Sequence, residues 1–254
     1  MGEFPITLSK RAPIDDFNTL FAGTGHFVSL SLISVFRCAG IQAKKIIGYS
    51  KHATLEIGEE PSSNDLHSWV ALVINQEWRL VDPYWCCTSV TGVGDAGWSL
   101  VAHDVGGAGP SKQEERVVYI LDEDYFLTDP EQFIYSHFPR DDDAWQFLAR
   151  PVTFREFVDM AYLKPPFFQL GLKLLEHKKC VLYAPQGEIE IKIGTPHIAS
   201  REFRYQLWMS NRQEIETVKL ERYCIMEQKD NTLFCRIRFP VEGKFKHKLY
   251  GRSA

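Results

Sequence analysis

The sequence predicts an α+β fold, in which a mixed core of helix and strands is followed by a small antiparallel β-sandwich. Three features of the 254-residue chain lead to this prediction. The first half has an apolar helical segment and several strand-like segments, and the last third has short alternating segments separated by turn residues. Between them, residues 139–151 combine prolines with consecutive aspartates, which indicates a boundary. We therefore expect a first domain at residues 1–138, a linker with a short helix at 139–165, and a β-sandwich domain at 166–254.

The first predicted element is a helix at residues 26–39. It is apolar on nearly every side, which is typical of a helix enclosed within a domain, and Gly40 can end it. Segments with the composition of strands follow at residues 43–49, 66–74, 77–81 and 116–121. The glycine-rich stretch at residues 92–110 predicts a long surface loop.

After the boundary, the sequence predicts one short helix and then strands. Thr153 and Glu156 have the spacing of a capping box, which places the helix at residues 153–160. The segments that read as strands are residues 188–193, 203–208, 217–226, 235–239 and 244–250. Alternation of apolar and polar residues in several of them is typical of a sandwich with one buried face per sheet.

Composition excludes several classes of function. The chain is 44% hydrophobic and 24% charged, with a net charge of −4, so we expect no nucleic acid partner. We find neither an apolar run long enough for a membrane span nor an N-terminal secretory signal. The six cysteines form no CxxC pair or zinc-type grouping, and adjacent Cys86 and Cys87 are best explained as buried thiols. We expect a cytoplasmic protein without cofactor or bound metal.

Two residues of the first domain form a candidate catalytic pair. His67 lies in one predicted strand and Asp82 ends the next. A two-residue turn at 75–76 would place Trp69 opposite Asp82, so His67 would be the diagonal neighbour of Asp82 on the same face. A carboxylate that orients an imidazole is the base half of a Cys-His-Asp triad, although an incidental pair on a sheet surface is the alternative.

The strings around this pair resemble one family. GYSKH and LHSWVALVINQEWRLVDPYW are similar to the transglutaminase-like superfamily, which has a papain-type core with a His-x-Trp strand and a Trp-Arg-x-Val-Asp-Pro strand. YFLTDPEQFIYSHFPRDDDAWQFL, PVTFREFVDMAYLKPPFFQLGL and FPVEGKFKHKLYG resemble the kyphoscoliosis peptidase and hillarin group within it. The resemblance covers roughly residues 20–250. It implies that the first domain is a transglutaminase-like domain and that His67 and Asp82 match the family's catalytic pair.

The chain departs from the family at the nucleophile. The resemblance implies a cysteine at the start of the buried helix, where the helix dipole favours a thiolate, and this position is occupied by Gly25. The neighbouring positions hold no cysteine either, and Cys38 lies about 20 Å away at the other end of the helix. Ser29 or Thr24 is an alternative nucleophile, but a hydroxyl is harder to deprotonate than a thiol.

Other candidate residues have simpler explanations. His26, at the helix start, is better explained as a half-exposed capping residue than as a new functional group. Trp69, Trp78 and Trp85 could line a substrate cleft, yet aromatic residues on adjacent strands more often belong to the core. The aspartates at 141–143 are expected to be a solvated linker.

We therefore predict a catalytically inactive pseudoenzyme, with His67 and Asp82 as a vestigial pair, that acts as a protein-interaction or scaffolding module. The resemblance implies a protein partner associated with the cytoskeleton. The alternative is an active, cysteine-independent peptidase or acyltransferase that uses His67 and Asp82 with Ser29 or water. The sequence does not determine the oligomeric state.

Overall fold

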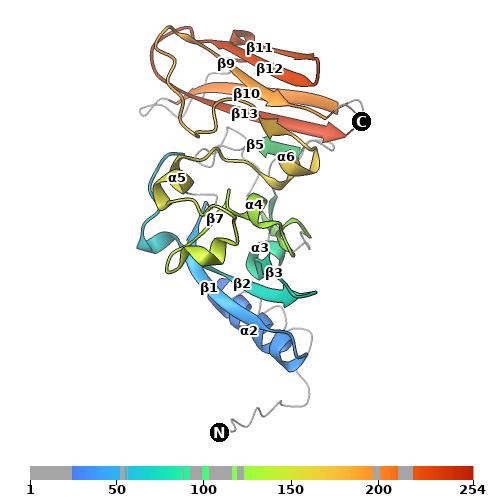
Figure 1. Cartoon of the computed structure of the whole chain (residues 1–254). Coiled ribbons are helices and arrows are strands. Elements are labelled where there is room, and N and C mark those ends of the chain that lie inside the picture. Colours follow the sequence, from blue (N-terminus) through green and yellow to red (C-terminus); the bar gives the residue numbers. More distant parts are fainter. Residues whose placement is uncertain are drawn as a thin grey trace.

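The computed structural model of the chain describes residues 25–51, 55, 57–87, 89–91, 99–102, 116–118, 123–196, 201–210 and 220–253. Figure 1 shows an elongated arrangement, with the N-terminal helix and its sheet at one end, the C-terminal strands at the other and short helices between them. This mixture of helices and antiparallel sheets is the predicted α+β class.

The first half is built on a four-stranded antiparallel sheet, sheet A, in the order β3-β2-β1-β7. Its strands are β1 (Ala43–Ser50), β2 (Leu66–Ile74), β3 (Glu77–Val81) and β7 (His137–Pro139), and helix α2 (Gly25–Cys38) precedes them. The predicted bounds of β2 and β3 are confirmed, and those of α2 and β1 differ by one residue. Asn75 and Gln76 form the turn with φ angles of 51° and 68°, as a two-residue hairpin requires. Ile74 therefore pairs with Glu77 as expected.

The two faces of sheet A pack against different groups, because successive strand residues point to opposite sides. Val70 and Leu72 of β2 pack with Ile33 of α2 in one buried cluster. Trp69 points the other way and packs with Phe133, from later in the chain. Helix α2 therefore covers one face of the sheet, and the other face is covered by chain that follows the hairpin.

Helix α2 is buried on one side only. Ser29 and Ile33 are buried, whereas Leu30 is 42% exposed and Val35 is 62% exposed. The prediction of a helix enclosed on all sides is therefore wrong for the described residues. Apolar composition shows that a helix can be buried, but sheet A covers just the face of α2 that turns towards it.

Short helices connect the two halves of the molecule. They are α3 (Pro83–Cys87), η2 (Glu123–Tyr125), α4 (Pro130–Phe133), η3 (Asp143–Gln146), α5 (Phe154–Asp159) and α6 (Pro165–Gln169). The predicted capping box is present at α5, between Thr153 and Glu156. The aspartate run is exposed as expected, and Asp142 also caps η3 through the backbone N–H of Ala144. None of the helices within the described ranges has the length and apolar character needed to cross a bilayer.

The C-terminal region consists of two antiparallel sheets around one core. Its strands are β8 (Lys173–Leu174), β9 (Glu188–Gly194), β10 (Arg201–Ser210), β11 (Cys224–Lys229), β12 (Thr232–Arg238) and β13 (Lys244–Ser253). Sheet E has the order β11-β12-β9-β8, and β10 pairs with β13 in sheet C. Ile193 and Leu233 from sheet E and Leu207 and Leu249 from sheet C are buried in the same cluster. The strand predicted at residues 217–226 begins later, at β11, because η4 (Glu221–Tyr223) precedes it; residues 217–219 lie outside the described part.

One segment expected to be a loop contains a strand. β5 (Ser99–Ala102) lies in the glycine-rich stretch, between β4 (Ser89–Thr91) and β6 (Arg116–Val118), and it pairs with β13. The loop prediction is therefore wrong for residues 99–102, and residues 92–98 and 103–110 lie outside the described part. Glycine enrichment indicates turns but cannot exclude a short edge strand, whose hydrogen bonds come from a partner far along the chain.

A buried lysine links the end of β1 to the segment around α5. Lys51, just after β1, is 3% exposed. Its Nζ donates a hydrogen bond to the Met160 carbonyl oxygen over 2.9 Å and lies 4.7 Å from the ring centre of Phe157 and 4.5 Å from that of Tyr162. Burial lowers the Lys51 pKa to about 7, because a desolvated ammonium is disfavoured.

Candidate functional site

The hydrogen bond predicted between His67 and Asp82 is present. His67 is the second residue of β2 and Asp82 directly follows β3, so the hairpin brings both side chains to one face. His67 Nε2 lies 2.6 Å from Asp82 Oδ2. The Asp82 side chain is fully buried and that of His67 is 12% exposed. Because Nε2 faces the carboxylate, Nδ1 is the nitrogen left to contact another group.

A second histidine, which the sequence analysis did not single out, completes the group. His137 opens β7 and its Nε2 lies 2.9 Å from the same oxygen, Asp82 Oδ2. Its side chain is fully buried. In the strand order β3-β2-β1-β7, β1 and β2 separate β7 from β3, the strand that leads into Asp82. The contact between His137 and Asp82, which are 55 positions apart in the chain, therefore depends on the order of the strands in the sheet. No local pattern encodes that order; the only available signal was the histidine inside one of the family-like strings.

The remaining oxygen of Asp82 is also occupied. Oδ1 accepts hydrogen bonds from the backbone N–H groups of Tyr84 (3.0 Å) and Trp85 (3.1 Å), so Asp82 caps the start of α3. Burial alone would raise the pKa of Asp82, but the charge and hydrogen bonds of His67 and His137 outweigh it and hold the pKa well below its usual range. Asp82 is therefore a carboxylate at neutral pH.

Aromatic rings enclose both imidazoles. Phe133 stacks on His137 with ring centres 4.0 Å apart, and Trp85 lies 4.5 Å from His137 and 5.8 Å from His67. Burial lowers the pKa of His137 to about 4, against the opposing effect of Asp82. The ring of His137 is therefore neutral at neutral pH. Of the three tryptophans weighed earlier, Trp69 belongs to the core, being 1% exposed, and Trp85 lines the site.

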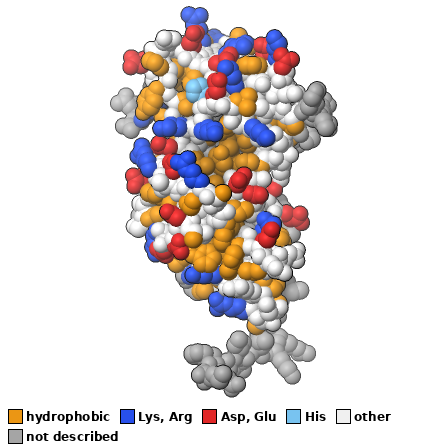
Figure 2. Space-filling model, in the orientation of Figure 1, with side chains coloured by type: hydrophobic (Ala, Val, Ile, Leu, Met, Phe, Trp, Pro, Cys, Tyr) orange, Lys and Arg blue, Asp and Glu red, His pale blue; other side chains and the backbone are white. Residues whose placement is uncertain are grey.

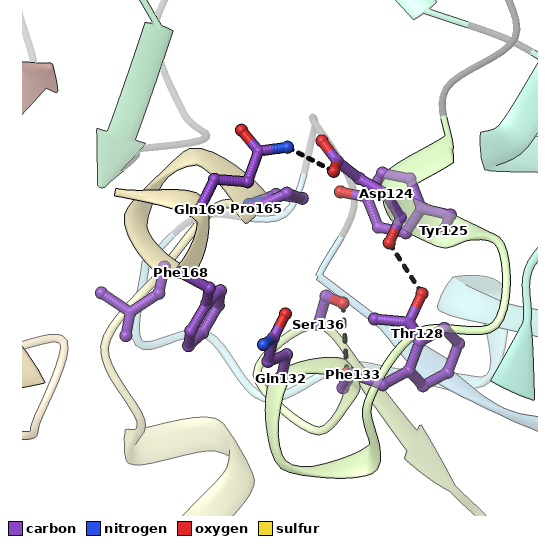
Figure 3. Close-up of a pocket in the computed structure, with 10 residues that line it drawn as sticks. Asp124, Tyr125, Thr128, Gln132, Phe133, Ser136, Pro165, Phe168 and Gln169 are labelled. Carbon is purple, nitrogen blue, oxygen red and sulfur yellow. Dashed lines mark hydrogen bonds between the residues drawn. The ribbon is translucent and has the colours of Figure 1, made fainter. Parts of the chain in front are cut away.

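A small pocket lies beside Ser136, the residue that precedes His137. Its cavity volume is about 40 Å³, room for a few water molecules. The residues that line it come from residues 124–136, which include α4, and from residues 163–169, which include α6 (Figure 3); they are Asp124, Tyr125, Thr128, Gln132, Phe133, Ser136, Leu163, Pro165, Phe168 and Gln169. Ser136 Oγ lies 2.8 Å from His137 Nδ1. The pocket is thus connected to Asp82 through Ser136 and His137.

The alternative nucleophile Ser29 is on the other side of the strand. Its buried hydroxyl donates to the Ser68 carbonyl oxygen over 2.9 Å and accepts a hydrogen bond from the Ser68 hydroxyl over 3.3 Å. Ser68 follows His67 in β2, so the two side chains point to opposite faces. The imidazole of His67 therefore points away from the Ser29 hydroxyl and is not placed to accept its proton.

Two cysteines of the first half also lie away from the imidazole. Cys38 is exposed at the C-terminal end of α2, and Cys86 is buried among Ile33, Val70 and Val81 on the α2 side of the sheet. Gly25 is the first residue of α2 as expected. That Gly25 faces His67 stays a prediction; Thr24 and the side chain of His26 lie outside the described part.

Comparisons with known proteins point to the group suggested by the sequence strings. Residues 154–254 match a family model described as a KY-like, immunoglobulin-like domain. Hillarin of Drosophila melanogaster is 28% identical over 85% of this chain, and the Lim and transglutaminase domain protein ltd-1 of Caenorhabditis elegans is 27% identical over 85% of it. Kyphoscoliosis peptidase of Mus musculus is 29% identical over 62% of the chain.

These comparisons describe a distant relationship. The C-terminal region is similar to the immunoglobulin-like domain of this group, in agreement with its two antiparallel sheets. The chain spans only 26% of hillarin, 29% of ltd-1 and 21% of the mouse kyphoscoliosis peptidase. It therefore corresponds to about a quarter of the length of the relatives that it matches.

Proposed function

We propose that this chain is a non-catalytic, protein-binding module with a transglutaminase-like core. One observation carries the proposal: glycine occupies position 25, where the resemblance places the nucleophile, while His67 and Asp82 keep the arrangement of the base half of a triad.

The chemistry of acyl transfer supports a non-catalytic role. An imidazole oriented by a carboxylate can accept a proton, but the covalent intermediate forms on a separate attacking atom. Glycine supplies none. Ser29 is engaged by Ser68 on the opposite face of β2, which weakens the alternative with a serine nucleophile. For the alternative in which His67 and Asp82 activate water, the described residues offer no specific contact in its favour.

A protein partner is better supported than a small molecule. The described pocket, at about 40 Å³, is far below the few hundred Å³ typical of small-molecule sites. Figure 2 shows apolar side chains gathered in the middle of the face it presents, with charged residues of both signs around them. Phe126 and Val35 are large apolar residues that are 48% and 62% exposed. The resemblance adds the cytoskeleton as the setting, and the cysteine pattern of the sequence favours the cytoplasm as the compartment.

Two experiments test the two parts of this proposal. A thiol-directed covalent peptidase probe should label the wild-type chain no faster than a His67→Ala variant, because no activated thiolate is expected. Labelling that depends on His67 would contradict the non-catalytic part. Co-sedimentation of the purified chain with actin filaments and with septin filaments tests the cytoskeletal part. Saturable binding to one of them is expected, and no saturable binding to either would remove that assignment.

A further inference from the structure

The pocket beside Ser136 combines apolar walls with one charged group. Its apolar surface comes from the side chains of Phe133, Leu163, Pro165 and Phe168. Among the ten residues that line the pocket, Asp124 is the only one with a charged side chain. Neither His67 nor Asp82 lines it, so a ligand in this pocket would not occupy the candidate catalytic pair.

Hydrogen-bond acceptors face the pocket from two sides. Figure 3 shows Asp124 and Gln169 on one side and Gln132 and Ser136 on the other. Gln169 Nε2 donates to Asp124 Oδ1, and a carboxylate has about four lone-pair positions, so this bond does not exhaust it. The Ser136 hydroxyl lies 2.8 Å from His137 Nδ1 and 3.2 Å from a backbone carbonyl oxygen. If its proton goes to the nearer atom, its lone pairs can accept from a ligand.

The chain around the pocket is acidic. Glu123, Asp124, Asp129 and Glu131 follow one another closely, and residues 117–139 contain no lysine or arginine. The side chains of Glu123, Asp129 and Glu131 are exposed. At physiological ionic strength such charges act over about 8 Å, which includes a ligand at the pocket. The surroundings therefore attract a cation and repel an anion.

We propose that this pocket binds the end of a basic side chain of the partner protein, with lysine as the better fit. A cavity of about 40 Å³ holds about three water-sized groups, and a lysine side chain ends in three, Cδ, Cε and Nζ. The guanidinium of arginine is a wider, planar group. The proposal deepens the proposed function, because it rests on this chain binding a protein.

The two kinds of pocket surface match the two parts of a lysine side chain. The methylene groups would lie against Pro165 and Phe168, where their burial is favourable. The ammonium has three N–H donors and would meet the Asp124 carboxylate, with Ser136 Oγ and the Gln132 amide oxygen as further acceptors. A desolvated ammonium requires such a carboxylate. A neutral side chain of the same length would gain only the apolar contact.

The pocket is formed before a partner arrives. Phe133 is 3% exposed and stacks on His137 with ring centres 4.0 Å apart. Thr128 Oγ1 donates over 2.7 Å to the Asp124 carbonyl oxygen, which holds the backbone of that residue. The bond from Gln169 ties Asp124 to the end of α6. Little ordering is therefore left to oppose binding.

The test is an NMR titration of the ¹⁵N-labelled full chain with the peptide acetyl-Gly-Lys-Gly-amide. The side-chain amide signals of Gln132 and Gln169, which line the pocket, should shift and saturate. The same peptide with norleucine in place of lysine keeps the stem and lacks the ammonium, so it should bind at least about tenfold more weakly. A glutamate peptide should not shift these signals.

One pair of variants isolates the carboxylate. Asp124→Asn keeps an oxygen that can accept from Gln169 but loses the charge, and it should weaken binding of the lysine peptide by about tenfold. The matched control is Glu176→Gln, which removes one negative charge near β8, where Glu176 pairs with Lys192. It should change the affinity by less than about twofold, because exposed charges far from the ligand are screened.

The comparison of the lysine and norleucine peptides uses the wild-type chain, so it holds even if Asp124→Asn does not fold. Equal affinity for the two peptides, or no shift of the two glutamine signals, would overturn the proposal. Unchanged affinity in folded Asp124→Asn would overturn it as well. Filament binding is measured separately: filament binding without lysine-peptide binding rejects the pocket alone, and the reverse result rejects the cytoskeletal assignment alone.

Discussion

Replacing Asp82 by alanine should destabilise the fold by about 3–4 kcal/mol. The carboxylate is fully buried and accepts from four donors: His67, His137 and the backbone N–H groups of Tyr84 and Trp85. The His137 ring has no exposed surface, so its lost partner costs about 1–3 kcal/mol. The lost cap of α3 adds about 1 kcal/mol. His67 is partly exposed and contributes less, because water can replace its partner.

Urea unfolding at pH 7 measures this effect, with tryptophan fluorescence as the signal because Trp69 and Trp85 flank the histidines. The matched control is Asp141→Ala. The Asp141 side chain is 65% exposed and pairs with Arg140 at the surface, so its removal should leave the free energy of unfolding almost unchanged. An effect of Asp82→Ala no larger than that of the control would refute the assignment of Asp82 as the organiser of the site.

Three further predictions concern the fold. Gly48→Ala should lower the free energy of unfolding by more than about 2 kcal/mol, because the new Cβ would lie 2.0 Å from a β7 carbonyl oxygen. The control is Gly187→Ala: Gly187 has a positive φ but open space around it, so this change should cost only about 1 kcal/mol in the same unfolding assay. Gln76→Gly should stabilise by about 0.5–1 kcal/mol since φ is 68° there, and Asn231→Gly should gain less because asparagine tolerates this conformation; equal gains would contradict the reasoning. The pKa of Lys51 is lowered from 10.5 to about 7 in the folded chain, so between these two pH values the unfolded chain binds one more proton than the folded chain. The free energy of unfolding should therefore rise with pH in this range, by at most about 1.4 kcal/mol per pH unit relative to Lys51→Met. Unfolding free energies of both proteins at pH 7, 8 and 9 check the slope, and a parallel pair of curves would show that Lys51 is not desolvated.

The sequence could predict the hairpin and the contact that depends on it. The register of β2 and β3 follows from a turn of two residues and from side-chain alternation, so the hydrogen bond between His67 and Asp82 was accessible from local information. The capping box of α5 is local for the same reason.

Features that depend on distant pairing were out of reach. The position of His137 requires β7 to pair with β1, and the β5 strand requires β13, more than 140 residues later. The exposed side of α2 depends on which elements cover it, and apolar content does not specify them. Local patterns constrain elements and short hairpins, whereas sheet order is decided by the whole chain.

The central claim, that a site with His67 and Asp82 but without a nucleophile is inactive, is tested most directly by one set of activity assays. Wild type, His67→Ala, Gly25→Cys and the double variant are assayed on casein and on a glutamine-donor and amine-acceptor pair. We expect no turnover by wild type above His67→Ala, and at most weak turnover by Gly25→Cys, because thiolate stabilisation and oxyanion donors must also be in place. Robust turnover by wild type that is lost in His67→Ala would contradict the account. Full activity of Gly25→Cys that is lost in the double variant would show that the missing nucleophile is the sole defect. It would contradict our expectation that thiolate stabilisation and oxyanion donors are also missing from the site.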